Sequence, residues 1–273
     1  MNTRPTGKAA TPLPDDDRGQ RRDTHRMRFH HHGELAGQAM VTLPKDASHH
    51  LMKVMRAAAG AEVELFNGDG CTYLAVIDTG STAREARLVI TARHPANGES
   101  PLDIHLVQAI SRGDRMDSAL RQATELGVAA IAPIYSEHAI PALDAKRAGK
   151  KREHWQAIAR SASEQSGRNR VPELAPPQHF STWLDDFRAS SRTCLPLMLV
   201  PGARLALTRA ASAAANHPII LLIGPESGFS TAEIRAANAA GIRSVSLGPR
   251  VLRTESAAPA ALAALQATCG DFS

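Results

Sequence analysis

The chain has 273 residues, of which 43% are hydrophobic and 22% charged, as in an ordinary globular protein with one large domain or two smaller ones. Its net charge of +5 favours a polyanionic partner. The three cysteines lie far apart and form no C-x-x-C unit, so we expect reduced thiols in a cytoplasmic protein. The apolar runs are too short for a membrane span, and the N-terminus lacks the apolar core of a signal peptide.

The first residues show few signs of a folded core. Residues 1–26 are polar, rich in Pro, Asp and Arg, and without periodicity, so they are predicted to form a disordered tail. The triplet His30-His31-His32 follows closely. Because no further cluster of ligand residues accompanies this short triplet, we predict no metal site there.

Residues 27–95 are β-rich. Apolar residues alternate on both sides of Asn67-Gly68-Asp69-Gly70, a sequence that favours positive φ angles and therefore predicts a β-hairpin. Residues 86–94 (ARLVITARH) give one more strand. Residues 46–60 (DASHHLMKVMRAAAG) predict a short helix closed by Gly60. Several short strands with one helix suggest a small barrel.

Residues 95–101 (PANGESP) have the composition of a linker. Beyond them, apolar runs of strand length alternate with helical patterns, which predicts an α/β domain with a mostly parallel sheet in residues 100–273. We expect strands at 102–110, 128–135, 195–200, 218–224 and 243–248, and helices at 114–127, 150–167, 181–190, 203–216, 230–241 and from about 254 onward. Ligands of such sheets bind beyond the carboxyl ends of the strands.

The loop after the predicted strand at 218–224 has the features of a binding loop. It reads Gly224-Pro225-Glu226-Ser227-Gly228, and its glycines allow main-chain groups to approach a ligand closely. Glu226 would act there as a charge partner or as a hydrogen-bond acceptor. The following Ser230-Thr231-Ala232-Glu233 is a capping box with Ser230 as the expected N-cap.

A second loop of this design, Gly248-Pro249-Arg250, precedes the last helix, which we expect Thr254 or Ser256 to cap. Arg253 and Glu255 lie at the junction, where they can reach a pocket. Neither loop contains G-x-x-x-x-G-K-[ST] or G-x-G-x-x-G, which argues against the usual phosphate cradles and a nicotinamide-dependent enzyme. Two plain βα turns are the alternative; two charged loops in succession favour a ligand held by main-chain groups, such as an adenine or an amino-acid moiety.

A third polar stretch, residues 161–174 (SASEQSGRNRVPEL), gathers charged and amide side chains around Gly167. Arg168 and Arg170 are candidates for contacts with RNA phosphates or bases. The alternative is a solvated helix end followed by a loop. The sequence alone leaves both interpretations open.

Four segments, IGPESGFSTAE, LGPRVLRTESA, ATELGV and EQSGRNRVPE, occur in this order when taken with the rest of the chain and together resemble the RsmE-type 16S ribosomal RNA (uracil-N3) methyltransferases, a branch of the SPOUT class. The resemblance extends from about Met27 to the C-terminus. The segments RFHHHGEL, SHHLMKVMRAAAGAEVELFNGDG and YLAVI are similar to the PUA-like RNA-binding domain of that family. The resemblance therefore implies such a barrel in residues 27–95 and a SPOUT methyltransferase domain in residues 100–273.

The resemblance also implies a C-terminal trefoil knot whose loops hold S-adenosyl-L-methionine, a homodimer, and N3-methyluridine at uracil 1498 of 16S rRNA in the small ribosomal subunit as the product. The implied cofactor-binding residues are Ile223, Gly224, Pro225, Glu226, Gly228, Leu247, Gly248, Leu252, Arg253, Thr254 and Ala257. The candidate phosphate contacts of the basic surface are Arg26, Arg28, Lys53, Arg56, Arg168 and Arg170. The chain departs from the family pattern at Ser227, where many relatives have glycine, and at Gln122, where lysine is common.

Methyl transfer to uracil N3 needs in-line alignment and help with removal of the N3 proton, but no metal. We expect Arg253 to stabilise negative charge on a uracil carbonyl, and Glu226 or Glu255 to act as the base or as an orienting carboxylate. A structural salt bridge is the alternative for each carboxylate. Two other functions stay open, namely a SPOUT methyltransferase for another RNA position or for transfer RNA, and a non-catalytic RNA-binding assembly factor.

Overall fold

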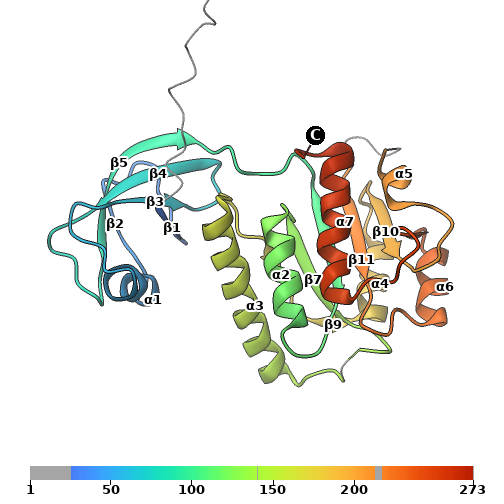
Figure 1. Ribbon diagram of the computed structural model, residues 1–273. Helices are drawn as coiled ribbons and strands as arrows, with labels where there is room; N and C mark the ends of the chain where they lie inside the picture. The colour runs from blue at the N-terminus through green and yellow to red at the C-terminus, as the bar shows by residue number, and fades with distance from the viewer. Residues whose placement is uncertain (1–25, 140, 213–216, 273) are drawn as a thin grey trace, which may run out of the picture.

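The computed structural model describes residues 26–139, 141–212 and 217–272. The predicted tail lies outside these residues except for Arg26, as do the last four residues of the helix predicted at 203–216. The described chain forms two sheets, one before and one after the linker that follows β5 (Figure 1). No helix in this part of the chain is long and apolar enough to cross a bilayer.

The first sheet, here called the N-terminal sheet, has the order β1-β3-β4-β5-β2. Its strands are β1 (Met27–His30), β2 (Met40–Thr42), β3 (Glu62–Phe66), β4 (Cys71–Ile77) and β5 (Arg87–Pro95). The antiparallel β3–β4 pair confirms the predicted hairpin, whereas β1 runs parallel to β3. Apolar side chains of one face, such as Val63, Leu65 and Tyr73, pack into a core of their own.

The helix predicted to end at Gly60 ends earlier. Helix α1 (Lys45–His49) continues into the π-helical turn η1 (His50–Val54). The Ala57 N–H then donates to the Leu51 carbonyl across Arg56, whose φ of 54° lies in the left-handed region. Gly60 instead donates its N–H to the Ile77 carbonyl. The prediction of a helix closed by Gly60 is therefore wrong, because Arg56 takes the left-handed position and Gly60 leads into β3.

The second sheet, the C-terminal sheet, is parallel in every described pairing, with the order β12-β10-β11-β6-β7-β8 and β9 beside β7. Its strands are β6 (Ile104–Ala109), β7 (Ala130–Tyr135), β8 (Glu173–Leu174), β9 (Gln178–His179), β10 (Leu195–Leu199), β11 (Ile219–Ile223) and β12 (Arg243–Val245). The predicted parallel α/β pattern is confirmed. The sequence analysis missed β8 and β9, because two residues are too few to show a periodicity.

Helices cover both faces of the C-terminal sheet. They are α2 (Arg115–Glu125), α3 (Ala145–Ser166), α4 (Phe180–Ala189), α5 (Leu207–Ser212), α6 (Thr231–Ala239) and α7 (Thr254–Cys269). Strand β11 is buried on both sides: Leu221 packs with side chains of α2, α5 and α7, whereas Leu222 packs with those of α4 and α6. A parallel sheet buried on both faces has continuous apolar strands of this kind.

The helix caps were predicted with mixed success. The capping box at Ser230 is present, with the Ser230 hydroxyl accepting from the Glu233 N–H and the Glu233 carboxylate accepting from the Ser230 N–H. Asp114 precedes α2, but its side chain makes no capping hydrogen bond. Neither Thr254 nor Ser256 is the N-cap of α7, because Arg253 occupies that position and Thr254 is the first helical residue.

Candidate functional site

Two glycine-containing loops meet at the carboxyl ends of β11 and β12. The first joins β11 to α6, and the second joins β12 to α7. The Thr254 hydroxyl, 4% exposed, donates to the Gly224 carbonyl across 2.8 Å. The same hydroxyl oxygen accepts from Gln108 Nε2 at 3.2 Å and lies 3.4 Å from Ser111 Oγ. This contact, here called the loop clamp, explains why a threonine stands at the start of α7.

The glycines of these loops are required by geometry. A Cβ atom on Gly224 would lie 3.1 Å from the Phe229 amide nitrogen, so a side chain at residue 224 would push the loop apart. Gly228 and Gly248 have φ angles of 73° and 77°, which side chains other than glycine seldom adopt. Ser227 is exposed and has no positive φ, so this departure from the family pattern causes no backbone strain.

The main chain of the second loop is available to a ligand. Within the described residues, no N–H group from Leu247 to Arg253 donates to another residue. The Leu247 and Leu252 side chains pack against the core and hold the loop in place. Ile223 and Ala257 are buried in that core beneath the loops, and Pro225 is buried as well. Free main-chain donors beside apolar side chains fit an adenine or amino-acid moiety such as S-adenosyl-L-methionine carries.

A third loop, which the sequence analysis did not include, reaches the same place. It follows β6, and its Arg112 N–H donates to Glu226 Oε1 at 3.2 Å. Arg115, the first residue of α2, donates through Nη1 to the same oxygen at 2.8 Å. Arg115 Nε also lies 3.9 Å from Glu255 Oε2, an oxygen that is buried without a hydrogen bond. Arg115 therefore stands between the two carboxylates that the sequence analysis selected.

The two carboxylates differ in their surroundings. Partial burial on its own would raise the pKa of Glu226, but the hydrogen bonds from its own N–H, from Arg115 and from the Arg112 N–H lower that pKa overall. A carboxylate with a lowered pKa is a weak base at neutral pH. Glu226 is therefore better suited to hold Arg115 than to accept a proton, whereas Glu255 has an oxygen without a hydrogen-bond donor.

Arg253 is exposed at the end of the second loop, and its side chain forms no hydrogen bond or ion pair with any residue that the structure describes. Its main-chain carbonyl accepts from the N–H groups of Ser256 and Ala257 in the first turn of α7. The guanidinium is therefore available to a ligand while the backbone is fixed. Gln122 lies on α2 away from the loops and donates to Ser118 Oγ at 2.9 Å.

The candidate RNA contacts fall into two groups. Arg168 is only 3% exposed, and all its hydrogen bonds go to protein groups, so the expectation that it contacts RNA phosphates is wrong. Arg28 also faces inward, with Nη1 2.7 Å from Glu64 Oε2, and pairs within the protein. Arg56 and Arg170 are exposed. Arg26 pairs with Glu62 at 2.8 Å, and Lys53 is exposed. The exposed cations keep the charge that phosphate contacts need.

Family models match both parts of the chain. A model described as the RNA methyltransferase domain matches residues 98–266, and one described as the RNA methyltransferase PUA domain matches residues 43–82. The chain is 32% identical to the ribosomal RNA small subunit methyltransferase E of Buchnera aphidicola subsp. Schizaphis graminum, over 86% of this chain and 93% of the relative. It is 32% identical to the protein of that name from Synechocystis sp., over 84% of this chain and 74% of the relative.

Solved structures agree in fold. A putative methyltransferase of Legionella pneumophila in complex with S-adenosylmethionine is 36% identical, with a TM-score of 0.83 over 90% of this chain and 99% of that chain. The ribosomal RNA small subunit methyltransferase E of Neisseria gonorrhoeae, bound to S-adenosyl methionine, is 35% identical, with a TM-score of 0.83 over 91% of this chain and 100% of that chain. The similarity therefore spans both sheets.

Proposed function

The chain belongs to the ribosomal RNA small subunit methyltransferase E family, and from this premise we propose that it methylates N3 of a uracil in 16S rRNA, at the family's position 1498. It is an RNA methyltransferase that uses S-adenosyl-L-methionine, the molecule found in the similar structures from Legionella and Neisseria. The cofactor supplies an activated methyl group when bound. The residues of the chain must then bind it, align the uracil and manage the N3 proton.

The loop clamp is the observation that supports this function most directly. Thr254 ties the β11–α6 loop to the start of α7, so the two loops that carry the proposed cofactor residues are held side by side. Unpaired N–H groups of residues 247–253 face a ligand that accepts hydrogen bonds, such as an adenine ring. We assign the cofactor site to these two loops.

The sheet order supports a knotted path for the C-terminal segment. Strand β10 lies between β11 and β12, yet the chain after β12 returns to β11, where Thr254 meets Gly224. Helix α7 then packs against α2 and α5, and Figure 1 shows it beside α2. A chain that crosses back over the sheet through neighbouring loops is what a trefoil knot requires. We therefore propose the SPOUT arrangement for residues 100–273 and a PUA-like RNA-binding domain for residues 27–95.

We propose separate roles for the charged residues of the site. Arg253 stabilises the negative charge that develops on a uracil carbonyl as the N3 proton leaves, because its guanidinium is exposed and always protonated. Glu255 accepts that proton or orients the base through its unpaired oxygen. Glu226 holds Arg115, which in turn faces Glu255. The transfer is in line, so alignment by these fixed groups contributes to the rate.

The remaining assignments follow from the family. We propose that the substrate is the small ribosomal subunit or its 16S rRNA, that Arg56 and Arg170 contact phosphates through their exposed side chains, and that the enzyme acts as a homodimer in the cytoplasm. Phosphate contacts of this kind weaken as salt rises.

The test is an in vitro assay with a labelled methyl donor and undermodified small subunits, whole or as naked RNA. We expect label in N3-methyluridine at a single 16S position. Label at another nucleotide or in transfer RNA would contradict the proposed target, and a chain that binds no donor in calorimetry would be a non-catalytic RNA-binding factor. Arg253→Ala should lower turnover far more than donor affinity; an equal loss of both would overturn the role given to Arg253.

A further inference from the structure

The motif in residues 164–172 (EQSGRNRVP) is not used by the two-loop site, yet it contains buried polar side chains. Arg168 and Asn169 are 3% and 1% exposed. Buried polar groups at the end of a helix cost stability unless every one of them has a partner. The partners of these two residues come from three separate parts of the chain, as the contacts below show.

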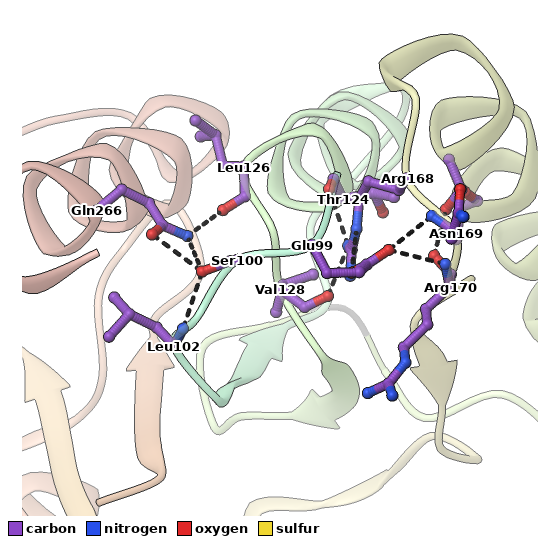
Figure 2. A network of polar contacts seen from close by, with 12 residues as sticks. Glu99, Ser100, Leu102, Thr124, Leu126, Val128, Arg168, Asn169, Arg170 and Gln266 are labelled. Carbon is purple, nitrogen blue, oxygen red and sulfur yellow. Dashed lines mark hydrogen bonds and ion pairs between the residues drawn. The ribbon is translucent and has the colours of Figure 1, made fainter. Parts of the chain in front are cut away.

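Arg168 is held between the linker and the end of α2. Its Nη1 donates to the carbonyls of Thr124 and Val128, at 3.0 and 2.7 Å. Its Nε and Nη2 donate to Glu99 Oε2, at 3.2 and 2.8 Å (Figure 2). The guanidinium therefore satisfies carbonyls at the C-terminal end of α2, where a positive charge is favourable.

Glu99 fixes the linker to the same motif. Its second oxygen, Oε1, accepts from the N–H groups of Asn169 and Arg170, at 2.7 and 2.8 Å (Figure 2). The linker also passes very close to the motif, since a Cβ atom on Gly98 would lie 2.4 Å from the Gly167 carbonyl oxygen. No side chain fits between these two segments, so the linker is held along the motif over several residues.

The opposite side of the motif contacts the N-terminal sheet. Arg28 of β1 donates through Nη2 to the Arg168 carbonyl at 3.0 Å and to Asn169 Oδ1 at 2.5 Å. Asn169 Nδ2 donates to Thr72 Oγ1 of β4 at 2.7 Å. Near them the His30 N–H of β1 donates to Glu164 Oε1 at 3.0 Å. One asparagine side chain thus links two strands of the N-terminal sheet to the C-terminal sheet.

We propose that Arg28, Glu99, Arg168 and Asn169 form a joint that fixes the N-terminal sheet against the C-terminal sheet, and that this joint positions the RNA substrate over the methyl-transfer site. The inference rests on the proposed function for its substrate. It gives residues 164–172 a positioning role in place of the direct RNA contact expected for Arg168. These side chains touch neither cofactor nor substrate in this arrangement.

The joint matters for an RNA that contacts both sheets. When two contact surfaces are rigidly placed, binding of the first raises the effective concentration of the RNA at the second. A loose joint spreads the N-terminal sheet over many orientations and lowers that concentration. The loss should appear in the KM for the RNA, with kcat at saturating RNA little changed, because the site itself stays intact.

Asn169 is the residue to change, because its side chain joins the sheets without supporting α2. Asn169→Ala removes the acceptor for Arg28 and the donor to Thr72. Asn169→Asp keeps an acceptor for the Arg28 guanidinium, and the Thr72 hydroxyl can donate to it, so this variant should restore the joint. The matched control is Asn238→Ala, which loses one hydrogen bond to Ser244 on α6 and no contact between the sheets.

The full chain is assayed with undermodified small subunits and labelled donor, alongside calorimetry for donor affinity and solution X-ray scattering for shape. For Asn169→Ala we expect the KM for subunits to rise by about tenfold or more, as the loss of a charge-assisted hydrogen bond would produce. We expect kcat to change less than about threefold and donor Kd less than about twofold, within the scatter of a distant, independent site. Scattering should show a larger maximum dimension.

Asn169→Asp and Asn238→Ala should both behave like the wild-type chain in every assay. An unchanged KM for Asn169→Ala, or a donor Kd that weakens as much as the KM, overturns the joint. If the wild-type chain methylates neither subunits nor naked RNA, the proposed function fails. The joint is then decided by scattering, where equal dimensions for wild type and Asn169→Ala overturn it and a selective expansion supports it.

Discussion

Removing the hydroxyl of the loop clamp tests whether the two loops form one cofactor site. Thr254→Val keeps the shape of the side chain, so no cavity results. The Gly224 carbonyl loses its donor at 2.8 Å, and Gln108 Nε2 keeps only its bond to the Ala109 carbonyl at 3.1 Å. Loss of one good buried hydrogen bond costs about 1–2 kcal/mol of unfolding free energy. For a chain of this size that corresponds to a decrease in Tm of about 2–8 °C.

The effect on the cofactor should be separate from the effect on stability. If the clamp holds the loops in the binding geometry, loss of about 1.4 kcal/mol of that preorganisation weakens the Kd for S-adenosyl-L-methionine about tenfold. Calorimetry on the purified chain measures that Kd. Thr254→Ser keeps a hydroxyl and should bind the donor nearly as the wild-type chain does.

The matched control for the clamp lies on the same helix. Thr268→Val removes a hydroxyl that donates to the Ala264 carbonyl at 2.6 Å near the end of α7, away from both loops. It should leave the donor Kd unchanged. If Thr254→Val loses stability as expected but binds the donor as tightly as Thr268→Val, the clamp does not shape the cofactor site and the reasoning is refuted.

Two further predictions concern the N-terminal sheet. Arg56→Gly should raise or preserve the Tm, because glycine removes a left-handed strain of about 1 kcal/mol, while RNA affinity and its salt dependence fall. Arg56→Ala should lose the same RNA affinity without the gain in Tm, and equal RNA affinity in both variants and wild type would exclude a phosphate contact. Burial, followed by the charges of nearby His32, Arg160 and His31, lowers the pKa of His30 to about 4, so the unfolded chain binds more protons between about pH 4 and 6.5. Stability should therefore fall as pH falls through that range, and His30→Asn should flatten the profile in urea melts; an identical slope would contradict this assignment.

The parts of the fold that the sequence predicted depend on local patterns. The capping box at Ser230 and the Asn67–Gly70 hairpin are set by residues within four positions of one another. The continuous apolar run of β11 indicates a strand buried on both faces, which a parallel sheet provides. Each of these features could be read without knowing what lies elsewhere in the chain.

The features that the sequence did not predict depend on distant partners. Arg115 looks like an ordinary helix-start residue until Glu226 and Glu255 are brought to it from the far end of the chain. Arg168 looks like a surface cation until Glu99 and the end of α2 surround it. A positive charge on a polar stretch predicts solvent or phosphate as its partner, and only the tertiary structure shows a buried carboxylate instead.

The arrangement of helices connects the proposed site to the proposed joint. Helix α2 begins with Arg115 at the carboxylates and ends where Arg168 binds the Thr124 carbonyl. Helix α7 begins at the loop clamp and, about 18 Å further along its axis, Gln266 donates to Ser100 Oγ in the linker and to the Leu126 carbonyl (Figure 2). Both helices therefore have one end at the site and the other at the linker.

A change at the linker end can reach the site through these helices. Removing the Arg168 guanidinium would leave the carbonyls at the end of α2 without their donor, and a shift of α2 would move Arg115 relative to Glu226. Such a variant would alter donor binding and RNA positioning together. Asn169 contacts neither helix through its side chain, so a change there isolates the orientation of the N-terminal sheet. A donor Kd that responds to Arg168→Met and not to Asn169→Ala would show that the helices transmit the change to the site.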